Sequence, residues 1–210
     1  MKPKGYLVFH LNLAFSSIEE EAWADVIRTC YHPLLDLIEE TGVPIGIELT
    51  GWTLRQIERI DNSWIERFKT LLNSNSCELI GSGYCQIIGP LVPYKVNEWN
   101  QKLGIDAYKK ILDCRPKIVL VNEMAFSSSL VDLYSQFGYK GFIMDRDNIK
   151  LALYSSNSTS NKMPTHAKGV DGAVIPVLWS DSILFQKVQH FAHGDISIND
   201  YLGYLKNRID

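Results

Sequence analysis

The sequence has few cysteines, and they lie far apart. Cys30, Cys77, Cys85 and Cys114 form no CxxC pair among the 210 residues. A zinc ribbon or a thioredoxin-like motif needs such a pair, so we expect neither. Because disulfides are rare in the cytosol and free cysteines are usually buried, we expect reduced, mostly buried thiols in a cytoplasmic protein.

The sequence also lacks an excess of one charge and a long apolar run. Its 21 basic and 24 acidic residues leave a net charge of −3, without the basic footprint of a nucleic-acid-binding protein. The apolar run at residues 6–13 is too short and too interrupted for a signal peptide or a membrane span. We therefore expect neither a nucleic acid nor a membrane as a partner.

An HxxxH pair is missing as well. Sugar deacetylases that fold as (β/α) barrels bind a divalent ion through an aspartate and two histidines, and the two histidines commonly have this spacing. Here His190 and His193 are separated by only two residues, and no pair of acids accompanies His10. We therefore expect no metal site and no cofactor. A metal-dependent polysaccharide deacetylase is a less favoured function for this chain than one without a metal.

Short apolar runs alternate with amphipathic stretches along the whole chain. Strands are expected at residues 6–13, 44–49, 78–81, 117–121, 141–144 and 173–178. Apolar residues at helical spacing fill the gaps, with Gly42 closing one helix and Asp61 capping another. This order predicts a parallel sheet flanked by helices, in a single domain of residues 1–210. Only residues 154–169 depart from the pattern, and their composition predicts a long loop.

Polar side chains follow nearly every expected strand. In chain order they are His10 and Asn12, Glu48, Gln86, Asn122 and Glu123, Asp145 with Asp147 and Asn148, and Trp179 with Asp181. The carboxyl ends of parallel strands converge on one face, so these residues can share a pocket. This placement favours a barrel over an open sheet. The mixture of carboxylates, amides, a histidine and an aromatic ring suits a carbohydrate.

Three segments together resemble a known family. They are His10-Leu11-Asn12 after the first strand, CELIGSGYCQIIGPLVP at residues 77–93, and VLVNEMAF at residues 119–126. The chain resembles glycoside hydrolase family 57, of the α-amylase and 4-α-glucanotransferase type, over nearly its whole length. The resemblance implies an incomplete (β/α)7-type barrel of parallel strands with outer helices, acting on α-glucans with retention. The family's usual His-Gln-Pro is replaced here by His10-Leu11-Asn12.

The resemblance also implies roles for individual residues. Glu123 matches the catalytic nucleophile, which forms a covalent glycosyl-enzyme. His10 matches a substrate-binding histidine. Glu78, Tyr84 and Gln86 fall in the region that lines the sugar-binding cleft.

The general acid/base has no clear match. In the family it is an aspartate on a later strand, and no aspartate after Glu123 lies in a comparable motif. Retaining hydrolysis needs two carboxyl groups about 5–5.5 Å apart. Asp145, in FIMDRDN, is the best candidate within the chain. We also expect that the chain stops before the strand that carries the family's aspartate.

Each of these residues has a structural alternative. Glu123 could pair with an arginine or lysine at the barrel rim, since buried charges are normally paired. His10 could be a hydrogen-bonded core histidine, Glu48 a salt-bridge partner and Trp179 a packing residue. The protein would then be a non-catalytic carbohydrate-binding or structural member of the family. The sequence does not separate a hydrolase from a transferase.

Overall fold

The computed structural model describes residues 5–146 and 164–209. Asp147, Asn148 and most of the expected loop at residues 154–169 lie outside the described residues. Within the described part, no helix is both long enough and apolar enough to span a lipid bilayer.

The described strands form one seven-stranded sheet in the order β1-β2-β3-β4-β5-β7-β6. Their bounds are β1 Val8–Leu11, β2 Ile45–Leu49, β3 Cys77–Gly81, β4 Ile118–Leu120, β5 Gly141–Asp145, β6 His166–Lys168 and β7 Val174–Ser180. Neighbouring strands from β1 to β5, and then β7, run parallel, and β6 pairs antiparallel with β7. The mostly parallel α/β fold is therefore confirmed.

Helices connect the parallel strands from β1 to β5, and two more helices follow β7. They are α1 Trp23–Val26, α2 His32–Thr41, α3 Gly51–Ile60, α4 Asn62–Asn73, α5 Tyr94–Leu112, α6 Ser128–Gln136, α8 Ser182–Ala192 and α9 Ile198–Ile209. Short 3-10 turns occupy η1 Glu20–Ala22, η3 Gly89–Leu91 and η4 Asn122–Met124, and the π-helical turn η2 Ile27–Tyr31 joins α1 to α2. The first predicted helix is thus interrupted just before Pro33, which has no N–H to donate to the preceding turn.

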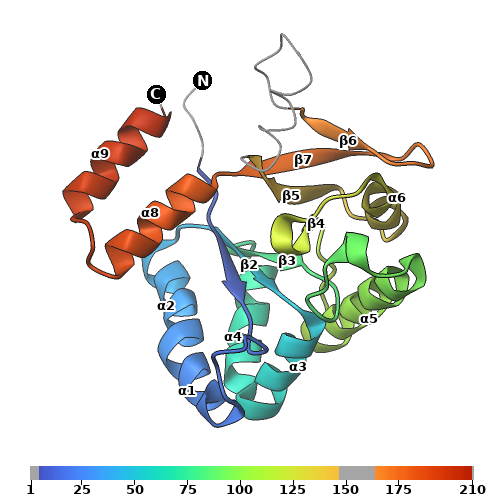
Figure 1. Ribbon diagram of the computed structural model, residues 1–210. Coiled ribbons are helices and arrows are strands. Elements are labelled where there is room, and N and C mark those ends of the chain that lie inside the picture. Colours follow the sequence, from blue (N-terminus) through green and yellow to red (C-terminus); the bar gives the residue numbers. More distant parts are fainter. Residues whose placement is uncertain (1–4, 147–163, 210) are drawn as a thin grey trace.

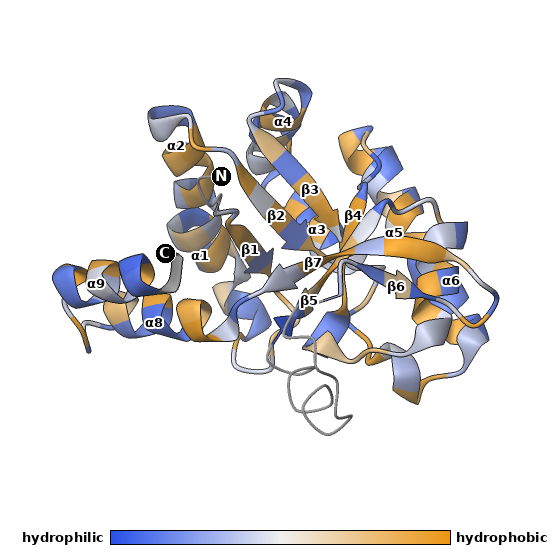
Figure 2. Cartoon of the chain, turned by 90° about the horizontal axis from the view of Figure 1, so that it is seen from above, coloured by the Kyte–Doolittle hydropathy of each residue, from blue (hydrophilic) through white to orange (hydrophobic). Residues whose placement is uncertain are grey.

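The helices pack against the sheet in two apolar clusters. One joins β1, β2 and β3 to helices α1 to α5, with Trp64 and Phe68 fully buried. The other joins β4, β5 and β7 to α6, around Phe142 and Tyr134. Figure 1 shows α1 to α5 along one side of the sheet, α6 at one end, and α8 and α9 at the other end near β1. In Figure 2 hydrophobic residues recur between polar ones along α1, α2 and α4, as expected for amphipathic helices.

The predicted helix ends are confirmed. Gly42 follows α2 in the left-handed conformation, with φ of 66°, and its N–H donates to the Ile38 carbonyl. The Asp61 side chain accepts hydrogen bonds from the backbone N–H groups of Ser63 and Trp64 at the start of α4.

Two expectations were wrong in detail. His166–Lys168, placed in a loop from composition, forms the edge strand β6, because its backbone pairs with residues Val174–Pro176 of β7. The cysteines are free but not mostly buried: only Cys77 is buried, whereas Cys30 and Cys85 are exposed.

The loop after β3 lies unusually close to α5. A Cβ atom added to Gly104 of α5 would lie 2.5 Å from the carbonyl carbon of Gly83. Gly83 itself has φ of +91°, and a Cβ there would lie 2.4 Å from the Asn100 amide nitrogen. The two glycines therefore let backbone meet backbone at this crossing.

We predict that Gly104→Ala destabilises the fold by about 1–3 kcal/mol, because the added methyl group must displace the loop. Gly203→Ala in α9 is the matched control, since no described atom lies within 4 Å of its added Cβ. That control should gain roughly 0.5–1 kcal/mol from helix propensity. Urea unfolding of both variants measures the difference, and equal stability would refute the close contact.

Candidate active site

Strand register brings several of the predicted site residues to one edge of the sheet. His10 on β1 pairs in register with Glu48 on β2, and neighbouring pairs continue through β3, β4 and β5. Because the strands are parallel and in register, their carboxyl ends lie together. This edge carries His10, Asn12, Glu48, Gln86, Glu123 and Asp145.

His10 and Glu48 form a hydrogen-bonded pair. His10 Nδ1 contacts Glu48 Oε2, and the Glu48 side chain is fully buried while the His10 side chain is 40% exposed. Burial lowers the pKa of His10, but the hydrogen bond to Glu48 and the negative charges of Glu48 and Glu123 outweigh it, so the net pKa is raised. Glu123 is therefore close enough to act on His10 electrostatically.

Glu123 is held by a chain of amide hydrogen bonds. The Gln86 Nε2 group donates to Glu123 Oε1 at 2.8 Å, and Asn12 Nδ2 donates to Gln86 Oε1 at 2.9 Å. The Asn12 oxygen in turn accepts from the Ala14 N–H at 3.0 Å. Two segments distant in sequence thus fix one oxygen of the Glu123 carboxylate, while Glu123 stays exposed.

The backbone at Glu123 is unusual. Glu123 has φ of 53° and Met124 has φ of 52°, in the left-handed region that non-glycine residues rarely adopt. The preceding Asn122 anchors the turn, because its amide oxygen accepts from Ser82 Oγ at 2.8 Å and its amide nitrogen donates to the Ser82 carbonyl at 3.1 Å. Strained backbone of this kind is common at functional sites.

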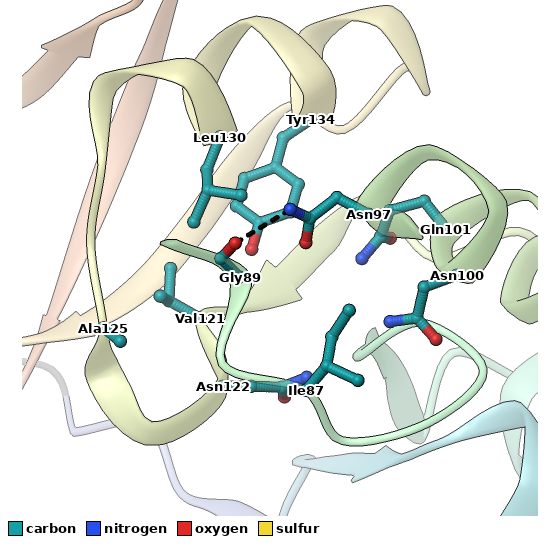
Figure 3. Close-up of a pocket in the computed structure, with 10 residues that line it drawn as sticks. All are labelled: Ile87, Gly89, Asn97, Asn100, Gln101, Val121, Asn122, Ala125, Leu130 and Tyr134. Atoms are coloured by element: carbon teal, nitrogen blue, oxygen red, sulfur yellow. Dashed lines mark hydrogen bonds between the residues drawn. The ribbon is translucent and has the colours of Figure 1, made fainter. Parts of the chain in front are cut away.

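Two asparagines of α5 hold the loop that carries Gln86. Asn100 Oδ1 accepts from the backbone N–H groups of Tyr84 and Cys85 at 3.0 and 2.7 Å, and its Nδ2 donates to the Cys85 carbonyl at 3.0 Å. Asn97 Nδ2 donates to the Gly89 carbonyl at 2.8 Å. Figure 3 shows both side chains reaching from α5 toward the loop. They line a cavity of about 10 Å³ that Asn122 also borders.

Neither asparagine was predicted as a site residue from the sequence. The available signal was their spacing of three in VNEWNQ, which places two amides on one face of a helix. Buried amides on a helix must find polar partners, so such a pair indicates an adjoining irregular backbone.

Tyr108 of α5 contacts the backbone at the start of the loop after β3. Its hydroxyl is fully buried, donates to the Leu49 carbonyl at 2.6 Å and accepts from the Ser82 N–H at 3.2 Å. Burial raises the pKa of Tyr108 well above its usual value, so this hydroxyl stays protonated. It links the ends of β2 and β3.

Asp145 ends β5, next to the strand that leads to Glu123. Leu120, the last residue of β4, pairs in register with Ile143, which lies two residues before Asp145. On its other side, Asp145 pairs in register with Ser180 of β7. Asp145 is partly buried and is not without a partner.

Glu78 lies away from this group. It is the second residue of β3, and its carboxylate accepts a hydrogen bond of 2.7 Å from the Tyr6 hydroxyl. Both residues line a cavity of about 290 Å³ together with Pro44 and Lys117, which precede β2 and β4. Glu78 therefore faces the amino ends of the strands, opposite the group around Glu123.

Tyr84 and Trp179 are also not brought into the group. The Tyr84 ring stacks under the Arg55 guanidinium of α3, with its centroid 5.4 Å from the guanidinium carbon. Trp179 pairs in register with Met144, packs against the apolar cluster under α6, and donates from Nε1 to the Pro164 carbonyl at 2.6 Å. Trp179 thus takes the packing role that the sequence left open for it, whereas for Tyr84 the resemblance implied only a place in the cleft.

Within residues 5–146 and 164–209, no three side chains of histidine, cysteine, aspartate or glutamate lie together as metal ligands would. The hydrogen bonds of His10 and Glu123 run instead to Glu48 and Gln86.

A family model for glycosyl hydrolase family 57 matches residues 7–208, nearly the whole chain. The chain belongs to glycosyl hydrolase family 57. A search among curated proteins found no match.

Solved structures of family 57 enzymes share the fold. A 4-α-glucanotransferase from Thermococcus litoralis matches with a TM-score of 0.72 and 17% identity, covering 95% of this chain and 31% of its own. The α-amylase AmyC from Thermotoga maritima matches with a TM-score of 0.66 and 15% identity, covering 90% of this chain and 47% of its own. This likeness bears out the family's incomplete-barrel architecture.

The fold is shared more widely. A putative polysaccharide deacetylase from Mycobacterium smegmatis matches with a TM-score of 0.58 and 17% identity, over 85% of this chain and 59% of its own. The chain spans about a third to three fifths of the length of these three proteins. Identities this low establish the fold alone.

We predict that Asn100→Ala destabilises the protein by about 1–3 kcal/mol, because the partly buried Cys85 N–H loses its acceptor and the Cys85 carbonyl loses its donor. Faster hydrogen exchange at residues 84–89 should accompany the loss. Asn73→Ala, at the exposed end of α4, is the control and should change stability by no more than about 0.5 kcal/mol. Equal effects of the two substitutions would contradict the anchoring role of Asn100.

Proposed function

We propose that this chain carries the nucleophile and sugar-binding residues of a retaining enzyme that acts on α-glucans, with Glu123 as the nucleophile. The observation that carries the proposal is the exposed Glu123 carboxylate at the carboxyl edge of the sheet, oriented by Gln86 beside His10. Membership of family 57 supports this role, since Glu123 lies in the motif that resembles the family's nucleophile region.

The substrate class follows from the relatives. The solved structures of similar fold include one named as a 4-α-glucanotransferase and one named as an α-amylase. We extend an α-glucan substrate to this chain on that basis. The polar edge agrees with a sugar ligand, because His10, Asn12 and Gln86 offer donors and acceptors for hydroxyl groups.

The chemistry needs two carboxyl groups. One oxygen of Glu123 forms a bond to the anomeric carbon while the bond to the leaving oxygen breaks, and that oxygen takes a proton from the acid. Water or a sugar hydroxyl then attacks the same carbon, gives its proton to the base, and releases Glu123. A hydrogen bond from Gln86 to one oxygen of Glu123 leaves the other oxygen to attack.

Asp145 is our candidate for the acid/base within the described residues. It ends β5, the strand beside β4, and is partly buried. The choice between hydrolase and transferase depends on which hydroxyl reaches the glycosyl-enzyme.

We predict that Glu123→Gln abolishes covalent labelling by a 2-fluoro-glucosyl fluoride, measured as a mass increase of the intact protein. Fluoride is a good leaving group that needs no acid, so labelling requires the nucleophile alone. Glu58→Gln on the exposed face of α3 is the control and should label like the parent protein. Unchanged labelling of Glu123→Gln would refute the assignment, and an unlabelled parent protein would favour a binding module.

The substitution Asp145→Asn tests the acid/base role of Asp145 independently of the nucleophile Glu123. We expect this substitution to lower maltooligosaccharide turnover about 10²–10⁴-fold while leaving fluoride labelling intact, because only the natural leaving group needs a proton. Turnover measured by release of reducing ends tests the role. Unimpaired turnover would exclude Asp145 as the acid.

A further inference from the structure

Glu48 is a buried carboxylate with one partner. Its Oε2 meets His10 Nδ1, whereas Oε1 has no hydrogen-bond partner among the residues that the structure describes. The side chain is fully buried, so solvent does not screen its charge. Burying an ionised carboxylate is costly unless a counter-charge lies beside it, and His10 is the group placed to supply that charge.

The pairing also fixes the orientation of the imidazole. With Nδ1 directed at the carboxylate, a charged ring keeps a second donor at Nε2. The titratable groups that act on His10 are Glu48 from β2 and Glu123 from the turn after β4. Both are negative, so both favour the imidazolium form.

We propose that Glu48 is a positioning residue, which holds His10 as an oriented imidazolium donor for a sugar hydroxyl next to Glu123. Glu48 itself is too buried to touch a ligand and acts only through His10. The inference rests on the proposed sugar site, but the ionisation of His10 can be measured without any sugar.

The positive charge of His10 should strengthen ligand binding at the site. A hydrogen bond from an imidazolium is stronger than one from a neutral ring, so ligand affinity should be greatest while His10 is charged. Because the pKa of His10 is raised in the folded protein, this affinity should persist above pH 6.5 and fall as the pH rises through the folded pKa.

The first test is NMR titration of the ring nitrogens in the ligand-free protein. We expect His10 to be an imidazolium at pH 6.5 in the parent protein, and Glu48→Gln to lower its titration midpoint by about 1–2 pH units. His32, which pairs with Asp61, serves as an internal reference. If His10 is neutral at pH 6.5 in the parent protein, the proposal is overturned, even where Glu48→Gln fails to fold.

The second test is calorimetric binding of maltoheptaose from pH 5.5 to 8.5. We expect Glu48→Gln to weaken binding about tenfold at pH 7.5, with the deficit shrinking at pH 5.5, where a larger fraction of His10 is charged even without Glu48. A purely structural loss would be equal at both pH values and would overturn the proposal. In a His10→Gln background, Glu48→Gln should add no further pH dependence.

Different results would overturn the α-glucan function and the role of Glu48. If maltoheptaose does not bind but His10 is still charged through Glu48, the α-glucan function and the sugar-donor role of His10 are both overturned. The positioning of the His10 ring by Glu48 would then still hold. Maltoheptaose binding and fluoride labelling, with a neutral His10, would keep the proposed function and overturn the role of Glu48.

Discussion

The in-register pairing of parallel strands is the constraint on which the site depends. It sets His10 beside Glu48 and continues across β3 and β4, so that Gln86 and Glu123 emerge at the same edge. A slip of one residue in β1 would turn His10 to the opposite face of the sheet and separate it from Glu48. The polar contacts at this edge are therefore a consequence of how the buried strands pack.

The loop after β3 converts that arrangement into a defined geometry. Asn97 and Asn100 bind its backbone from α5, and Gly83 and Gly104 let helix and loop meet. Gln86 is thereby fixed against Glu123, although neither residue lies in a regular strand. The left-handed turn at Glu123 completes the site, and the bonds between Asn122 and Ser82 hold it. These contacts keep the exposed Glu123 carboxylate, on a turn with strained backbone, in one orientation.

The sequence predicted the six parallel strands, the caps at Gly42 and Asp61, and a group of polar residues at strand ends, because apolar periodicity and turn chemistry are local signals. It did not predict that Glu78 faces the amino end, which depends on where β3 begins. Nor did it predict that Tyr84 packs on α3, or that β6 forms a strand, since both depend on neighbours distant in sequence. Tertiary contacts decided those cases.

Ligand mapping by two-dimensional NMR tests the central claim, that a glucan binds at the carboxyl edge, most directly. Titration of the labelled protein with maltoheptaose should shift the side-chain amide signals of Asn12 and Gln86, whose bonds surround Glu123. The backbone signals of Glu78 and Lys117, at the opposite edge, should stay unchanged. Shifts confined to Glu78 and Lys117 would contradict the account.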